Sequence, residues 1–143
     1  MNAAEIFPYV NTAPLPIWII WMAAPRSRPA RALAASTWPW VLLGLAYAGA
    51  IGMTLAGPAA EGASFFSLSG VMALFDTEWG AFAGWIHYLC FDLFVGRWIL
   101  NDAPEAGRRL TPILFLTLMF GPLGLLSYLA LRPWIRGGGG VDR

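Results

Sequence analysis

The stretch WGAFAGWIHYLCFDLFVGRWIL, residues 79–100, decides the fold because it is long and apolar yet contains His87, Asp92 and Arg97. A helix that crosses a bilayer needs about 20 predominantly apolar residues. Ionisable side chains within such a helix are costly, and they usually face the interior of a bundle. The stretch therefore predicts a membrane helix that packs against other helices and carries polar groups into the interface.

Three further apolar stretches accompany it, at residues 6–24, 38–56 and 113–131. The first is interrupted by prolines and polar residues, which predicts a broken helix. The second is rich in Gly and Ala, which lets helices approach closely in lipid. The fourth contains Gly121-Pro122 near its middle, which predicts a kink.

These patterns predict an all-α fold, an integral membrane bundle of four transmembrane helices. It forms a single domain over residues 1–136, and a flexible Gly-rich tail follows at 137–143. Between the second and third spans, apolar residues recur at helical spacing within 64–75, interleaved with serines. This segment is interpreted as a short amphipathic helix in the interface plane, or alternatively as an ordered loop.

The basic residues are nine arginines, and the chain has no lysine, which excludes Schiff-base chemistry. The formal net charge of +1 argues against a nucleic-acid partner. Arginines lie in the first and third loops, whereas the second loop is acidic. By the positive-inside rule, the first and third loops are cytoplasmic and the N-terminus is outside. Four spans then place the C-terminus outside as well, although Arg132 and Arg136 there favour the opposite side.

The ionisable residues of the third span each have two interpretations. Asp92 is either a desolvated carboxyl that acts as an acid or a base, or a buried group that fixes helix packing. His87 either shuttles protons and bonds a ligand, or is a packed residue, which is slightly favoured. Arg97 is either an electrostatic partner at the site or a side chain that snorkels to the interface. Asp102, just beyond the span, is expected to pair with Arg108 or Arg109.

Aromatic residues in the same span are candidates for a ligand groove. Trp85 and Phe91 lie deep enough to line a groove for an apolar or polyene ligand, although ordinary packing explains them too. Tyr88 shares a helix face with Asp92, and Asn11 is a polar residue in the broken first helix. These four are the candidate ligand-binding residues. His87 and Cys90 do not complete a metal site, so no bound metal is expected.

Three stretches resemble a known family. These are HYLCFDLFVGRWI at residues 87–99, MFGPLGLL at 119–126 and NTAPLPIW at 11–18. They resemble the abscisic-acid-deficient-four-like family, a plastid membrane family required for neoxanthin formation. The resemblance covers nearly the whole chain and implies a four-helix membrane protein tied to carotenoid metabolism.

In plants this family is associated with converting violaxanthin to neoxanthin, an isomerisation that opens an epoxide and loses a proton to form an allene. The resemblance therefore implies an isomerase that uses acid and base groups and no redox cofactor. Asp92, His87 and Arg97 match the polar residues of the family signature and would supply those catalytic roles. The chain shows no plastid transit peptide, however, and its lysine-free, Ala-rich composition is typical of a bacterial protein.

The sequence thus predicts a protein of the bacterial inner membrane that isomerises or otherwise modifies a carotenoid or another polyene. The plant substrate is not transferred to it. The alternative is a non-enzymatic protein that binds pigment or lipid, or that assembles with a larger complex. A transporter is less favoured, because four helices offer a pathway only as an oligomer. The oligomeric state is left open.

Overall fold

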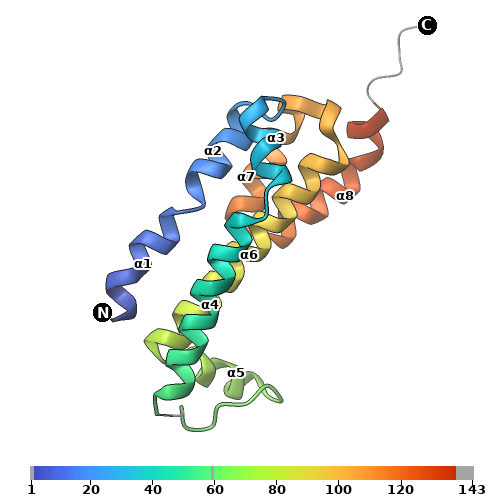
Figure 1. Ribbon diagram of the computed structural model, residues 1–143. Helices are drawn as coiled ribbons and strands as arrows, with labels where there is room; N and C mark the ends of the chain where they lie inside the picture. The colour runs from blue at the N-terminus through green and yellow to red at the C-terminus, as the bar shows by residue number, and fades with distance from the viewer. Residues whose placement is uncertain (1, 59, 138–143) are drawn as a thin grey trace, which may run out of the picture. The chain divides into compact units, whose positions relative to one another are not determined.

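The computed structural model of the chain describes residues 2–58 and 60–137, and all regular structure in these ranges is helical. The all-α class is therefore confirmed, while tail residues 138–143 lie outside the described residues. The helices, shown in Figure 1, are α1 (Ala3–Thr12), α2 (Leu15–Ala23), α3 (Arg28–Ala35), α4 (Trp38–Ala56), α5 (Leu68–Leu74), α6 (Glu78–Asp102), η1 (Pro104–Leu110), α7 (Thr111–Phe120) and α8 (Pro122–Gly137).

The chain divides into two compact units, each described here by itself. Unit 1 comprises Met1–Ala13 and Pro39–Cys90, and unit 2 comprises Pro14–Trp38 and Phe91–Arg143. The long helix α6 contributes its first half to unit 1 and its second half to unit 2.

The first predicted helix is broken, as its prolines indicate, because α1 ends at Thr12 and α2 begins at Leu15. Asn2 caps α1: its side chain accepts from the N–H of Glu5 at 2.9 Å, and the Glu5 carboxylate accepts from the N–H of Asn2 at 3.0 Å. This reciprocal pair satisfies two backbone donors that a helix start otherwise leaves unbonded.

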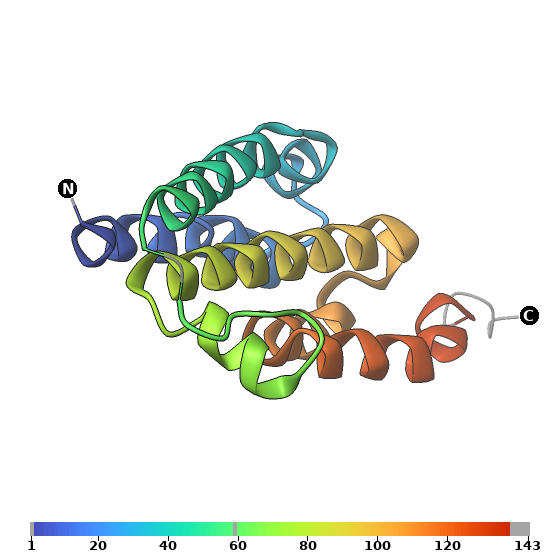
Figure 2. The same ribbon diagram turned by 90° about the horizontal axis from the view of Figure 1, so that it is seen from below.

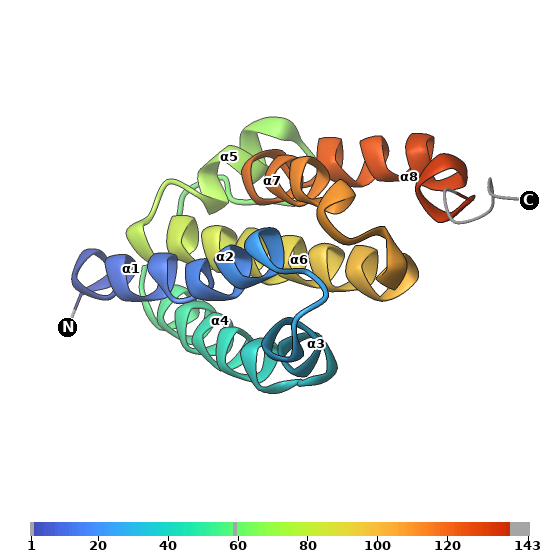
Figure 3. The same ribbon diagram turned by 90° about the horizontal axis from the view of Figure 1, so that it is seen from above.

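In unit 1, α1 lies alongside the beginning of α6 (Figure 3). The Phe7 ring lies 6.1 Å from the rings of Phe82 and Trp85, within the range of favourable aromatic contact. The predicted helix at 64–75 is present as the shorter α5, whose first turn is capped by the Ser67 hydroxyl accepting from the N–H of Gly70 at 3.1 Å. Several large apolar side chains of this region are exposed: Phe65, Phe66, Leu68 and Met72.

In unit 2, α7 and α8 form a helical hairpin, so the predicted fourth span is not one kinked helix (Figures 1 and 2). The chain reverses at Gly121, whose φ of 27° and ψ of −85° lie outside the helical range. After the reversal, Gly124 returns to Thr117: a Cβ on Gly124 would lie 2.4 Å from the Thr117 Cα. In a continuous helix, residues seven apart are about 10 Å apart along the axis. The sequence therefore predicted the position of the break correctly, but it predicted a kink where the chain reverses direction.

The second half of α6 runs parallel to α8. Near one end of the pair, a Cβ on Gly121 would overlap the Asp92 carboxylate. Farther along, the rings of Trp98 and Tyr128 are 5.4 Å apart and perpendicular, and at the end Asp102 bonds Arg132. Helix α8 therefore runs along α6 in the same direction, and the C-terminal end of α8 lies beside the C-terminal end of α6.

Among the described residues, two helical stretches are long and apolar enough to cross a membrane, Ala3–Ala23 and Trp38–Ala56. Helix α6 is long enough, but its polar residues lower its hydropathy. The predicted fourth span is divided into α7, with 10 residues, and α8, with 16. The bundle of four membrane-crossing helices is therefore not confirmed.

Candidate functional site

Asp92 lies at the reversal between α7 and α8. Asp92 is only 8% exposed. Its carboxyl group points at Gly121: if Gly121 carried a Cβ, the three atoms nearest to that Cβ would be the carboxyl atoms of Asp92. Glycine is needed here both for its positive φ and for the approach of the carboxylate. Gly121 directly precedes α8, so the carboxylate lies near a helix N-terminus, where the helix dipole favours negative charge.

Two of the three stretches that carry the family resemblance meet at this point, since Asp92 belongs to residues 87–99 and Gly121 to residues 119–126. The third stretch reaches the same unit through Trp18. This side chain is 1% exposed, and a Cβ on Gly96 would lie 2.6 Å from its Cη2 atom. Gly96 therefore lets α2 pack closely on α6.

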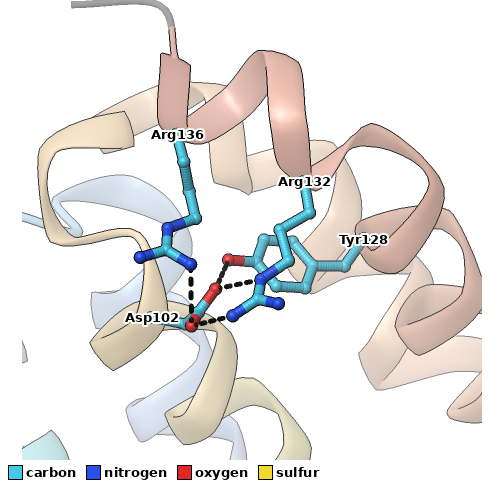
Figure 4. A network of polar contacts seen from close by, with 4 residues as sticks. All are labelled: Asp102, Tyr128, Arg132 and Arg136. Atoms are coloured by element: carbon cyan, nitrogen blue, oxygen red, sulfur yellow. Dashed lines mark hydrogen bonds and ion pairs between the residues drawn. The ribbon is translucent and has the colours of Figure 1, made fainter.

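A second polar cluster lies at the C-terminal end of α6 and is shown in Figure 4. Asp102 accepts from Arg132 Nε at 2.8 Å and from Arg132 Nη2 at 2.6 Å, an arrangement typical of strong charge-assisted bonds. The fully buried Tyr128 donates its hydroxyl to Asp102 Oδ2 at 2.5 Å. Arg136 forms a longer ion pair, with Nη1 3.7 Å from Asp102 Oδ1. The Arg132 guanidinium also lies over the Trp98 ring, 5.8 Å from its centroid.

The expected pairing of Asp102 with Arg108 or Arg109 is therefore wrong. Its partners come from α8, because the hairpin returns that helix to the end of α6. Hydrogen bonds from Arg132 and Tyr128, with the charges of Arg132 and Arg136, hold the pKa of Asp102 well below its usual range. Asp102 is thus a structural anion that fastens α8 to α6.

In unit 1, the structure brings three predicted ligand-binding residues together. Trp85 donates its Nε1–H to Asn11 Oδ1 at 2.8 Å, and its ring lies 5.2 Å from that of Tyr88. Beside them is a groove of about 410 Å³ between α1 and the start of α6, lined by Ala3, Ala4, Phe7, Glu78, Ala81, Phe82 and Trp85. The groove is mainly apolar, with one carboxyl at its edge, and suits an apolar ligand.

The remaining candidates differ in their surroundings. His87 is exposed, and its ring lies 6.0 Å from the ring of Tyr47 on α4. Phe91 is 57% exposed and Arg97 is half-buried. The joint catalytic role of His87, Asp92 and Arg97 stays a prediction. Within residues 2–58 and 60–137, no group of three or more His, Cys, Asp or Glu side chains is placed to hold a metal ion.

Sequence reasoning missed the partners of Asp92 and Asp102. Gly121 was identified as a kink, but its positive φ and its contact with Asp92 have no signature in hydropathy. Arg132 and Arg136 did carry a signal, because their charge opposed an outside C-terminus. Taken as evidence against a fourth crossing, that signal would have pointed to the hairpin.

Comparison with known proteins agrees with the resemblance seen in the sequence. A sequence profile described as ABA DEFICIENT 4-like matches residues 5–128. Protein ABA DEFICIENT 4, chloroplastic, of Arabidopsis thaliana is 28% identical over 139 residues, which cover 93% of this chain and 63% of that protein. The chain thus spans less than two thirds of the length of this relative. No solved structure matches the chain. Because the profile covers most of its length, the chain belongs to the ABA DEFICIENT 4-like family.

Proposed function

We propose that the chain is an integral membrane protein of carotenoid metabolism that uses Asp92 to move a proton on a polyene end group. The observation that carries this proposal is the buried Asp92 carboxylate at the α7–α8 reversal, where two of the stretches resembling the family meet. Burying a carboxylate in a mostly apolar chain is costly, and such groups commonly mark functional sites. Family membership supports the carotenoid assignment.

The proposed chemistry is an isomerisation without a redox step. A base removes a proton from carbon, the electron pair forms the new double bond, an epoxide C–O bond breaks and the oxygen takes up a proton. Asp92 would be the base, because its carboxyl group is buried at the α7–α8 reversal and a carboxylate can accept a proton. Arg97 would stabilise the charge on the oxygen, and His87 would hydrogen-bond the ligand.

We further propose a specific membrane topology, which the α7–α8 hairpin supports. In this proposal Ala3–Ala23, Trp38–Ala56 and α6 cross the bilayer, whereas the α7–α8 hairpin enters and leaves on one side. Ten residues of α7 span about 15 Å, roughly half of the hydrocarbon core. With the N-terminus outside, the first and third loops and the end of α8 are all cytoplasmic. The arginines of the first and third loops, together with Arg132 and Arg136, then satisfy the positive-inside rule.

The test is the Asp92→Asn variant, expressed in a carotenoid-producing bacterial host, with the pigments compared by chromatography. This change keeps the shape of the side chain and removes its ability to accept a proton. The matched control is Asp76→Asn, which neutralises an exposed carboxylate outside α6. We expect the pigment profile to change for Asp92→Asn alone. An unchanged profile at normal protein levels contradicts the catalytic role.

A second candidate function is pigment or lipid binding without turnover. It is favoured by the aromatic groove of unit 1 and by the Trp85–Asn11 hydrogen bond that fixes its wall. Purification in a mild detergent separates the two functions. A coeluting polyene that Phe7→Ala releases, combined with an unchanged pigment profile for Asp92→Asn, favours binding.

A further inference from the structure

Four arginines of unit 2 lie near η1: Arg26, Arg108, Arg109 and Arg136. Arg26, which follows α2, contacts Glu105 of η1, and both line a cavity together with Arg109 and Arg136. Arg108 joins Arg26 and Arg109 around a neighbouring groove of about 460 Å³, which we call the arginine groove. Its full lining is Ala23, Ala24, Pro25, Arg26, Ser27, Glu105, Ala106, Gly107, Arg108 and Arg109.

Positive charge exceeds negative charge in the arginine groove. Glu105 is its one acidic lining residue and pairs with Arg26 at 3.2 Å, but the two side chains are 92% and 56% exposed. An ion pair that is this exposed contributes little, although Arg26 also donates to the backbone carbonyl of Glu105. Arg109 donates to the Ala106 carbonyl at 3.3 Å, and neither Arg108 nor Arg109 forms an ion pair within the described part of the chain.

The backbone of η1 shapes the groove. Gly107 has a φ of 57°, and a Cβ at this position would lie 3.2 Å from Arg26 Nε. A glycine here therefore lets the Arg26 side chain lie directly on the loop that presents Arg108 and Arg109. Arginine forks of this kind suit a phosphate, which accepts several hydrogen bonds at once.

The groove continues into an apolar surface. Along α2, Leu15 and Ile19 are 39% and 60% exposed, and the exposed Ala23 follows at the same spacing, at the edge of the groove. Residues four apart lie on one face of a helix, so these three form an apolar stripe that ends at the arginines. A ligand that matches both parts carries a phosphate at one end and a hydrocarbon chain at the other.

We propose that the arginine groove binds the phosphate of an anionic phospholipid headgroup, whose acyl chain lies along the exposed stripe of α2. This binding is separate from the proposed chemistry at Asp92 and does not depend on it. The lipid would link η1 to the end of α2 and so stabilise the end of unit 2 from which α7 begins. Thr111, the first residue of α7, already contacts α2 there by donating its hydroxyl to the Met22 carbonyl at 2.8 Å.

The experiment uses the full chain, purified in mild detergent and depleted of lipid. Thermal unfolding is followed by tryptophan fluorescence during titration with dioleoyl phosphatidylglycerol, with dioleoyl phosphatidylcholine, or with inorganic phosphate. A ligand that binds the native state raises the unfolding temperature with concentration. We expect phosphatidylglycerol to raise it, and the other two probes to have much smaller effects at equal concentration.

Two matched variants locate the site. Arg108→Gln removes one charge from the groove and should weaken phosphatidylglycerol binding about tenfold, the usual effect of losing a charge-assisted hydrogen bond. Arg28→Gln removes the same charge from α3, outside the groove lining, and should change binding less than twofold. Glu105→Gln removes the competing carboxylate and should strengthen binding.

Each contrary outcome overturns the proposal. Equal stabilisation by inorganic phosphate would assign the groove to a free anion rather than to a lipid. Equal weakening by Arg28→Gln and Arg108→Gln would show that the lipid is attracted by overall charge and not bound in the groove. If phosphatidylglycerol leaves the unfolding temperature unchanged, the groove does not bind an anionic phospholipid. None of these results bears on the pigment profile of Asp92→Asn, so the two proposals fail separately.

Discussion

The substitution Gly121→Ala tests the geometry on which the candidate site depends. The positive φ of Gly121 disfavours any residue with a Cβ by about 1–2 kcal/mol. The added methyl group would also overlap the Asp92 carboxylate, and overpacking of a well-packed site costs about 1–3 kcal/mol. We therefore expect the free energy of unfolding to fall by about 2–5 kcal/mol.

The loss can be divided into its two causes by a double-mutant cycle. Asp92→Ala removes the three atoms nearest to the new Cβ, so in that background Gly121→Ala should cost mainly the backbone strain, about 1–2 kcal/mol. The assay is unfolding in mixed micelles with increasing denaturing detergent, followed by tryptophan fluorescence. The control is Gly44→Ala in α4, where a Cβ meets nothing within 4 Å.

Replacing glycine with alanine within a helix stabilises it by about 0.5–1 kcal/mol, so Gly44→Ala should be neutral or stabilising. If Gly121→Ala behaves like Gly44→Ala, the chain does not reverse at Gly121 as described. If Gly121→Ala costs the same with and without the Asp92 carboxylate, the close approach of the two residues is refuted.

Three further predictions follow from the other contacts. Asp102→Asn should lower the free energy of unfolding by about 1–3 kcal/mol, because Arg132 and Tyr128 lose their anionic acceptor. The same micelle titration measures this loss, and a loss no larger than that of Asp76→Asn contradicts the prediction. Since the pKa of Asp102 is lowered on folding, its contribution to stability is complete above the unfolded value of about 3.9 and is lost as pH falls toward the folded value; unfolding measured from pH 6 downward should therefore lose less stability in Asp102→Asn than in the unchanged chain. A reporter fused to the C-terminus should be active on the same side of the membrane as one inserted in the first loop, and activity on opposite sides would mean that α7 and α8 together cross the bilayer once.

Local features of the sequence predicted the elements well. Pro14 and Pro16 located the break between α1 and α2, because proline limits the conformation of its neighbours and lacks an N–H donor. The spacing of apolar residues predicted a helix between the second and third segments, which begins as α5 at the Ser67 cap. These signals act within a few residues, so one sequence is enough to read them.

The arrangement of α7 and α8 was not predictable by the same means. Residues 113–131 form an apolar run long enough to cross a bilayer, and hydropathy is identical for a crossing helix and for a hairpin of two half-length helices. The difference depends on the backbone of Gly121 and on its contact with Asp92, which is 29 positions earlier in the chain. For the same reason Asp102 was assigned to nearby arginines, although Arg132 lies closest in space.

The hairpin has a consequence for how the protein is made. At 10 residues, α7 by itself is too short to cross the bilayer, and α8 carries two arginines near its end. In the proposed topology, the α7–α8 pair is therefore expected to enter the bilayer last, after α2 and α6 offer a protein surface that it can fold against. The ion pair between Asp102 and Arg132 would then close the newly inserted hairpin onto α6, and a nascent chain truncated before Arg132 should remain exposed to membrane quality-control proteases.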